Sequence, residues 1–298
     1  MKRFYILAMG LAGIILAASC SEEANKDNEP DVQQPVQLVF KGVQSDGGAD
    51  TKSYLDGGSV YWNTYDAINV FAGGSSYRFD TKEGGATVTF VGVVLSEDVI
   101  YFGLYPYNES ATYSYNSSTK DITYNTTFPS SQKALENSFA MDANITVAQT
   151  TNTEMAFHFK NVCGLIKFNI TSSEASLPFT KAVLKGRNSE DIAGDVTITY
   201  NHNNEPSTTN PSISITGSAV KTITLNVVDD DPGDAITPTF AKDTDYYFVV
   251  PPTSFSTGYT ITFYNDDESI SKVHSIATSK EVKRSKILDA GTYNYVAP

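Results

Sequence analysis

The sequence is poor in the residues that cross-link small secreted proteins or commonly perform catalysis. Among 298 residues there are two cysteines, three histidines and one tryptophan. Basic residues are also scarce, with 21 Lys and Arg against 34 Asp and Glu, and the net charge is −13. Such a chain repels nucleic acid and anionic lipid headgroups, so we expect neither as a partner. Two cysteines allow at most one disulfide, so the fold must depend on packed cores.

Long hydrophobic runs are missing except at the very start of the chain. Lys2 and Arg3 precede a mostly apolar run over residues 4–18, which ends in small residues. This order is typical of a secretory signal peptide. As a helix the run would reach only about 22 Å, short of the roughly 30 Å hydrocarbon core of a bilayer. We therefore predict a signal peptide over residues 1–19 and no membrane-spanning anchor.

The first cysteine lies where the apolar run meets an acidic segment. Residues 17–20 (AASC) resemble a bacterial lipobox, in which the cysteine thiol receives a diacylglycerol and the bond before it is then cut. A thioether to lipid requires a sulfur nucleophile, which explains a cysteine at this place. The motif predicts cleavage between Ser19 and Cys20, lipid attachment at Cys20 and anchoring in the outer membrane. Ordinary signal cleavage near this point is the alternative.

Residues 20–35 carry many Glu, Asp, Asn, Gln and Pro and almost nothing to bury, which predicts a flexible acidic tether. Residues 21–23 (SEE) also resemble the short Ser-plus-acidic signal found after the lipid-bearing cysteine of surface-exposed lipoproteins. A solvated linker without any signal is the alternative interpretation.

The rest of the chain favours an all-β fold. Short runs rich in Val, Ile, Thr, Tyr and Phe alternate with polar residues, as at 86–92, 222–228 and 259–264. Val88 and Phe90 share one face of their run while Thr87 and Val91 share the other, which is typical of a strand buried on one side. Many such strands with turn residues between them indicate β-sandwiches.

The length of the chain indicates two domains. A polar gap at residues 149–153 predicts an N-terminal sandwich over 36–150 and a C-terminal sandwich over 151–298, and a second gap at 172–178 is the alternative. We chose the first gap because the runs 156–160 and 165–170 are expected to pair onward with 181–185.

Catalytic and metal-binding patterns find little support. His158, His202 and His274 are widely separated in sequence, and no short metal-ligand spacing links them. His158 lies in a predicted strand, and we interpret it as a packing residue. Residues 229–234 (DDDPGD) carry hard oxygen ligands without the loop spacing of a Ca²⁺ site, so we read them as a solvated turn. We predict no enzyme activity, no cofactor and no metal.

Several segments together resemble the fimbrillin or Mfa-like family of bacterial surface lipoproteins. The landmarks are, in chain order, residues 51–52 (TK), 60–62 (VYW), 66–71 (DAINVF), 101–107 (YFGLYPY), 128–132 (FPSSQ) and 157–168 (FHFKNVCGLIKF). They span most of the chain after the tether, although each is weak alone. Tyr65 stands where the family usually has Gly. The resemblance implies two tandem transthyretin-like β-sandwiches and a structural, anchor or tip subunit of a fimbrium (pilus) that acts in cell adhesion.

The landmarks themselves have structural explanations. We expect Trp62 to fill the first core and Asp66 to bond turn amides before the strand at 68–71. A sugar-stacking platform remains the alternative for Trp62 and for the tyrosines around Pro106. Cys163 is expected to pack as a small hydrophobic residue.

Assembly in such a family proceeds by donor-strand exchange after a protease removes the first strand. Residues 36–40 (VQLVF) fit that strand, and residues 44–52 form an open loop after it. The usual cleavage residue, arginine, is absent between Cys20 and Arg78, so either Lys41 or Lys52 is the maturation site, or the subunit is never cut and stays a lipid-held anchor. Residues 286–296 are the expected donor. The expected partners are therefore other subunits or the chain itself, with host or bacterial surface glycans or proteins as receptors. A polysaccharide-binding outer-membrane lipoprotein of a nutrient-uptake system is the alternative function.

Overall fold

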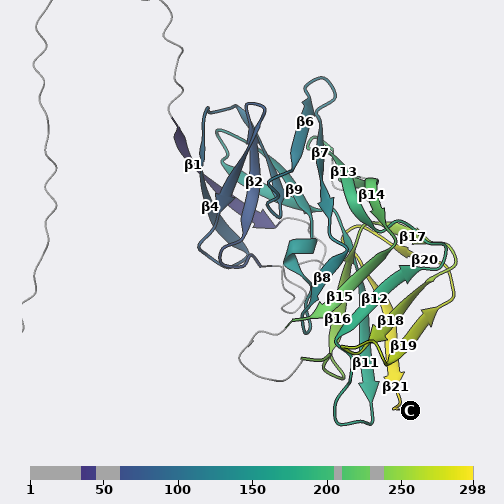
Figure 1. Ribbon diagram of the computed structural model, residues 1–298. Coiled ribbons are helices and arrows are strands. Elements are labelled where there is room, and N and C mark those ends of the chain that lie inside the picture. The colour runs from purple at the N-terminus through teal and green to yellow at the C-terminus, as the bar shows by residue number, and fades with distance from the viewer. Residues whose placement is uncertain (1–34, 45–60, 205–209, 229–237, 298) are drawn as a thin grey trace, which may run out of the picture. The chain divides into compact units, whose positions relative to one another are not determined.

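The computed structural model describes residues 35–44, 61–204, 210–228 and 238–297, which form an all-β fold (Figure 1). Residues Gln34–Pro298 group into one compact unit. Within the described ranges the helical element is a single 3-10 turn, η1 (Met141–Ala143). The prediction of an all-β chain is thus confirmed, while the transthyretin-like topology stays a prediction. Ser19, Cys20, Lys52 and residues 229–234 lie outside the described residues.

One sheet closes into a barrel that draws on distant parts of the sequence. Its strands follow the order β1 (Val36–Gln44), β10 (Ala156–Asn161), β9 (Thr146–Thr151), β5 (Ile100–Tyr105), β2 (Ala67–Ala72), β3 (Ser75–Asp80) and β4 (Thr87–Val94). Closure matters because it leaves none of these strands with an unpaired edge.

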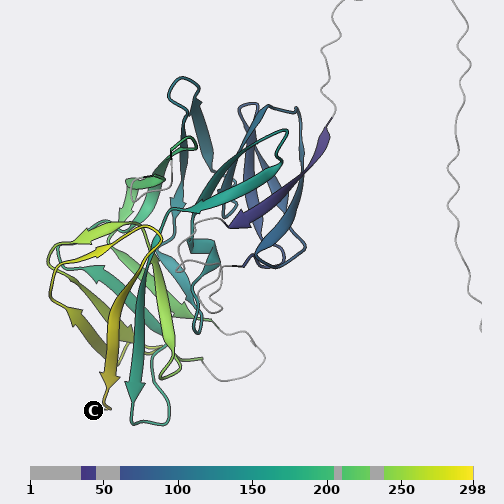
Figure 2. The same ribbon diagram turned by 180° about the vertical axis from the view of Figure 1, so that it is seen from behind.

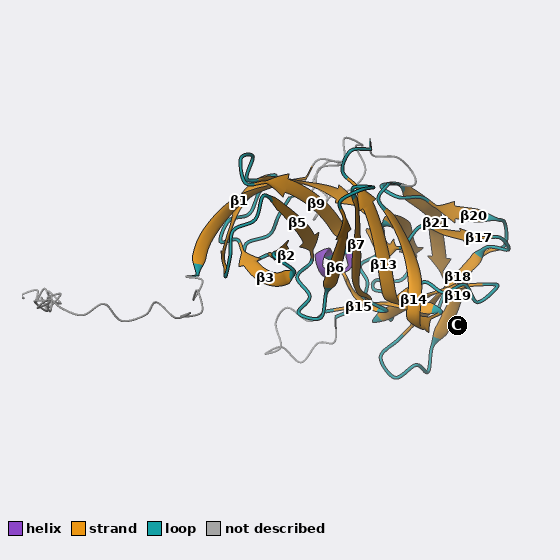
Figure 3. Cartoon of the chain, turned by 90° about the horizontal axis from the view of Figure 1, so that it is seen from above, coloured by secondary structure: helices purple, strands orange, loops and turns teal. Residues whose placement is uncertain are grey.

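The remaining strands form four open sheets, which Figure 3 shows beside the barrel strands. A four-stranded sheet has the order β14 (Ser212–Val220), β13 (Ala193–Asn201), β7 (Asp121–Phe128) and β6 (Thr112–Asn116). A five-stranded sheet has the order β19 (Ser271–Ile276), β18 (Tyr259–Tyr264), β12 (Lys181–Gly186), β15 (Thr222–Val227) and β8 (Ser131–Ala134). A three-stranded sheet has the order β16 (Asp245–Val250), β11 (Gly164–Ser172) and β21 (Ile287–Tyr295), and β17 (Thr253–Phe255) pairs with β20 (Lys280–Val282).

The alternation read from the sequence determines which faces are buried. In β4, Val88 and Phe90 are buried, whereas Thr87 is exposed and Val91 keeps 38% of its surface. The runs predicted at 222–228 and 259–264 correspond to β15 and β18. The period of two is therefore a reliable guide to strand orientation in this chain.

The pairing expected around residue 150 is wrong. Strand β10 pairs with β1 and β9 in the barrel, and β11 pairs with β16 and β21, so neither pairs with β12. Strand β9 runs across the predicted domain boundary between residues 150 and 151. Local gaps in the sequence did not reveal these pairings because strands far apart in sequence form them. The boundary itself stays a prediction.

Two side chains connect separate sheets through backbone groups. The Gln132 carboxamide donates to the Val249 carbonyl at 2.8 Å and accepts from the Val249 N–H at 3.0 Å, both buried. The Tyr124 hydroxyl donates to the carbonyl of Ala148 in the barrel at 3.0 Å. Buried amide and hydroxyl groups need such partners, so these contacts fix how the sheets pack.

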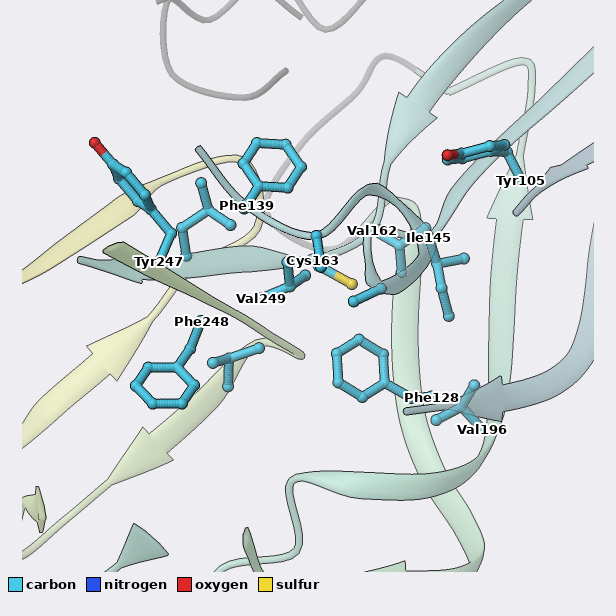
Figure 4. Packing of buried hydrophobic residues seen from close by; sticks show 14 of the residues in the cluster. Tyr105, Phe128, Phe139, Ile145, Val162, Cys163, Val196, Tyr247, Phe248 and Val249 are labelled. Atoms are coloured by element: carbon cyan, nitrogen blue, oxygen red, sulfur yellow. The ribbon is translucent and has the colours of Figure 1, made fainter. Parts of the chain in front are cut away.

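Cys163 lies in this packed interior, as the sequence predicted. Its side chain is fully buried in a cluster that includes Phe128, Ile145 and Val249 (Figure 4). Burial raises the pKa of its thiol to about 12. A thiol in such surroundings stays protonated at neutral pH and is chemically inert.

Candidate functional site

The first strand is held on both of its edges. β1 pairs antiparallel with β4 along Val36–Val43 and parallel with β10 along Lys41–Gln44 (Figures 1 and 2). Within the barrel β1 therefore closes a gap between β4 and β10. Its removal would expose the backbone donors and acceptors of both neighbours.

The inner face of β1 fills the barrel core. Leu38 keeps 8% of its surface and Phe40 none. The Phe40 ring lies 5.5 Å from that of Phe79, 4.9 Å from that of Tyr101 and 4.9 Å from that of Phe157, measured between ring centroids. Aromatic pairs at these separations are favourable beyond the area that they bury. Phe40 thus joins aromatic side chains from three other strands.

Gly42 completes the same inner face because no side chain fits there. A Cβ atom at this position would lie 2.5 Å from the Phe90 ring and 3.6 Å from the Trp62 ring. The groove between β4 and β10 therefore requires a large apolar residue followed, two positions later, by glycine. This spacing is a specificity rule for any strand that occupies the groove.

The predicted maturation residue Lys41 lies inside β1. Its side chain is exposed, but its backbone pairs with Thr89 and Ala156, and its N–H donates to the Met155 carbonyl at 2.9 Å. Proteases bind substrates in an extended, unpaired form, so Lys41 must leave the barrel before it can be cut.

Trp62 has the core position that the sequence predicts. Its ring is fully buried and meets those of Phe90, Tyr105 and Phe159 edge to face, with centroids 5.1 Å, 5.1 Å and 5.2 Å away. A sugar-stacking platform needs an exposed ring face, so that alternative is wrong for Trp62.

The tyrosines around Pro106 are mostly structural as well. Tyr101 and Tyr105 are buried, with 1% and 3% of their surface exposed. The Tyr107 ring is partly exposed, and the Arg78 guanidinium lies 4.9 Å from its centroid. The cation therefore already interacts with this ring.

Asp66 closes a turn, as expected. Its carboxylate accepts from the Asn63 N–H at 2.7 Å, and its own N–H donates to the Asn63 carbonyl at 3.2 Å. Tyr65, between them, has a φ of 72° and is 77% exposed. Glycine adopts this backbone conformation without strain, which explains the glycine usual at this turn in the family that the sequence resembles.

A hollow of about 330 Å³ lies beside this turn, and its lining includes Asp66, Tyr105, Lys133 and Asp142. The Tyr105 hydroxyl donates to the Asp66 carboxylate at 3.3 Å. Burial raises the pKa of Asp66 to about 6, and the charge of Asp142 adds to the shift. The sequence identified the turn but gave no signal of this burial, because Lys133 and Asp142 come from elements more than 60 residues away.

One of the three histidines departs from its expected role. His158 lies on the exposed face of β10, with its Nε2 atom 3.5 Å from the Glu154 carboxylate, so the packing interpretation is wrong. Burial lowers the pKa of His202, and the nearby charges of Lys160 and His158 act in the same direction. The Nε2 of His274 donates to the Ala290 carbonyl at 2.8 Å. Since a carbonyl only accepts, Nε2 carries the proton.

Within the described ranges, no group of three or more His, Cys, Asp or Glu side chains is arranged to hold a metal ion. No helix in that part of the chain combines the length and apolar character needed to cross a membrane.

No family model matches the chain, and no curated protein does. Solved structures with similarity include a candidate cell adhesion protein from Bacteroides uniformis, with a TM-score of 0.45 and 15% identity over 85% of this chain and 91% of that one. Another, from Bacteroides ovatus, has a TM-score of 0.45 and 11% identity over 86% and 91% of the two chains. The tip fimbrial protein Mfa3 from Porphyromonas gingivalis, truncated at its C-terminus, has a TM-score of 0.32 and 10% identity over 86% and 94%.

Removing the Phe40 ring should strongly destabilise the protein. We expect Phe40→Ala to lower the free energy of unfolding by about 3–5 kcal/mol, because it leaves a cavity among packed aromatic rings. The control is Val39→Ala on the exposed face of the same strand, for which we expect a change of about 0.5 kcal/mol or less. Urea unfolding followed by tryptophan fluorescence measures both. Equal losses in the two variants would contradict the role given to Phe40.

The buried carboxylate predicts a pH dependence of stability. The folded pKa of Asp66, about 6, lies above its ordinary value, so folding favours the protonated form. The contribution of Asp66 to the free energy of unfolding is therefore fully present below the ordinary pKa of its carboxyl group. It is lost as the pH rises through about 6. We expect Asp66→Asn to be more stable relative to wild type at pH 7 than at pH 4. Urea unfolding at both values tests this, with Glu109→Gln, an exposed carboxylate, as the control. If the stability of Asp66→Asn relative to wild type is the same at pH 4 and at pH 7, the charged form of Asp66 is not destabilised by burial.

Proposed function

We propose that the chain is a lipid-anchored, surface-displayed subunit of an adhesive filament, and that β1 is the strand exchanged during assembly. The observation that carries this proposal is the place of β1 in the barrel. It follows the predicted tether directly, pairs on both edges and fills the groove with Leu38 and Phe40. A strand of this kind can be replaced by an equivalent strand of another subunit.

The sequence resemblance supports the same function. The family landmarks include Trp62 and Asp66, and both occupy structural positions around the barrel. The lipobox at Cys20 and the acidic residues after it support export to the outer membrane and display at the cell surface. Host or bacterial surface glycans or proteins are the corresponding receptors.

The position of Lys41 favours Lys52 as the maturation site. Cutting at Lys41 would divide a paired strand, whereas Lys52 comes after the end of β1 at Gln44. Cleavage after Lys52 would leave β1 attached only through its pairing and its packed side chains. Exchange could then proceed without breaking any further covalent bond.

The groove also restricts the choice of donor strand. In residues 286–296 the only glycine is Gly291, and Asp289 stands two positions before it. In the register and direction of β1, this stretch would place a carboxylate in the aromatic cluster around Phe40, at a large desolvation cost. The stretch is also paired in cis, as β21 beside β11. The β1 strand of an uncut second copy meets the spacing rule and stays joined to its own barrel, so it is the donor that we propose.

Lipid attachment at Cys20 can be tested independently of assembly. Metabolic labelling with a clickable fatty acid such as a palmitate analogue should label the wild-type chain, and Cys20→Ala should lose the label and remain as precursor or soluble protein. Cys163→Ala is the matched control and should keep full labelling, because its thiol is buried. Undiminished label in the Cys20→Ala protein would refute the anchor.

Controlled trypsin treatment tests strand exchange. In a partly cut mixture we expect a new N-terminus after Lys52, followed by oligomers of cut and uncut chains as the concentration rises. Lys52→Gln should block both events, and Lys41→Gln should block neither. A peptide of residues 36–44 should suppress the oligomers by filling the groove, while the same peptide with Phe40→Asp should not. A partly cut mixture that stays monomeric at high concentration would rule out this assembly, because its uncut chains still carry a β1 strand joined to a barrel.

A further inference from the structure

The edge of the four-stranded sheet at β14 lacks the usual protection against pairing with another chain. β14 is nine residues long, and none of its side chains is charged. The opposite edge of the same sheet, β6, is also uncharged but has only five residues, and the edges of other sheets in the described part of the chain carry further protection. β8 has four residues including Lys133, β19 contains Lys272, and β21 contains Asp289 and a left-handed Gly291 with φ 79°. Short length, charge and irregular backbone are the common devices that keep sheet edges from associating.

The regular part of β14 runs from Ser212 to Ile215, and Thr216 is the extra residue at a register shift. Its pairing with β13 is regular from Ser212 to Ile215, and the register shifts between Asp195 and Val196 of β13. Ser218 then has a φ of 45°. The irregular backbone therefore disturbs only the end of the edge, and a charge-free segment centred on Ser214 remains available.

Side chains along this segment alternate in a simple pattern. Ser212, Ser214 and Thr216 are exposed, whereas Ile213 and Ile215 are partly buried against the core. A strand added here must place apolar side chains next to the two isoleucines and small polar ones on the outer face. The segment itself has this alternation, so it is complementary to a copy of itself in the antiparallel direction.

Hydrogen bonds across the outer face hold the strand in place before any partner arrives. Thr197 of β13 donates to the Asn125 carboxamide of β7 at 2.8 Å, and its hydroxyl lies 3.3 Å from that of Thr216. The Asn125 amide nitrogen donates in turn to the Thr112 hydroxyl of β6 at 3.3 Å. This row spans all four strands. Pairing at an edge ordered in this way loses little conformational freedom.

We propose that β14 pairs antiparallel with β14 of a second copy, around a two-fold axis at Ser214. In this register Ile213 lies opposite Ile215 of the second copy, and Ser212 lies opposite Thr216. Two chains of net charge −13 repel each other, and a contact through β14 adds no charged side chain to that repulsion. The proposal does not depend on strand exchange at β1.

An edge contact of this length is small and hence transient, so the test traps it covalently. Residues opposite each other in an antiparallel pair have Cα atoms about 4.5–5.5 Å apart, within the range of a disulfide. We therefore expect Ser214→Cys, made in residues 21–298, to form a covalent dimer under mild oxidation. This segment contains the compact unit, and its only native cysteine, Cys163, is buried.

The matched control is Thr199→Cys, on the same exposed face but one strand inward, next to Ser212. Its copies would lie three strand spacings apart across the sheet, about 14 Å, and four residues apart along it, too far for a disulfide. We expect the Ser214→Cys dimer to form at least about tenfold faster than the control dimer, since only its thiols fall within disulfide range. Equal rates would overturn the proposal, and circular dichroism of the reduced variants checks that both are folded.

Direction and register have their own test. A mixture of Ser212→Cys and Thr216→Cys proteins should cross-link faster than either protein alone, because these positions face each other only in the antiparallel register. A mixture no faster than the separate proteins would overturn the proposed axis.

Discussion

The packing of Phe40 against the aromatic rings of Phe79, Tyr101 and Phe157 is the contact on which the barrel depends. These rings belong to different strands, so each strand needs the others in place before its own aromatic side chain is buried. The backbone contributes the second half of the constraint, because β1 has hydrogen-bonded neighbours on both edges. The packing of the aromatic side chains and the pairing of β1 with its neighbours therefore form together and are lost together.

Local sequence revealed the strands but not all of their partners. The alternation in β4 predicted correctly that Val88 and Phe90 are buried, and the lone tryptophan correctly indicated a core position. The same alternation could have corrected the interpretation of His158. Phe157 and Phe159 point inward, so the residue between them must point outward. The sequence therefore contains the signal that places His158 on the outer face of β10.

Other features could not be read from the sequence because they arise from distant pairing. The parallel contact between β1 and β10 joins residues more than 100 positions apart, and no local motif encodes its register. The raised pKa of Asp66 likewise depends on burial in a hollow that includes Tyr105, Lys133 and Asp142. For the site, the sequence predicted the turn and the first strand, whereas the burial and the spacing rule at Gly42 required three-dimensional packing.

Strand β1 is hydrogen-bonded to a neighbour on each side, and this has a mechanical consequence. Tension that reaches the chain ahead of Val36 pulls along the axis of β1, parallel to both neighbouring strands. The inter-strand hydrogen bonds lie across that direction, so many of them bear the load at once instead of opening one after another. Such shear loading resists rupture better than peeling does. A tethered protein in flowing liquid would thus be held most firmly by the same strand that closes its barrel.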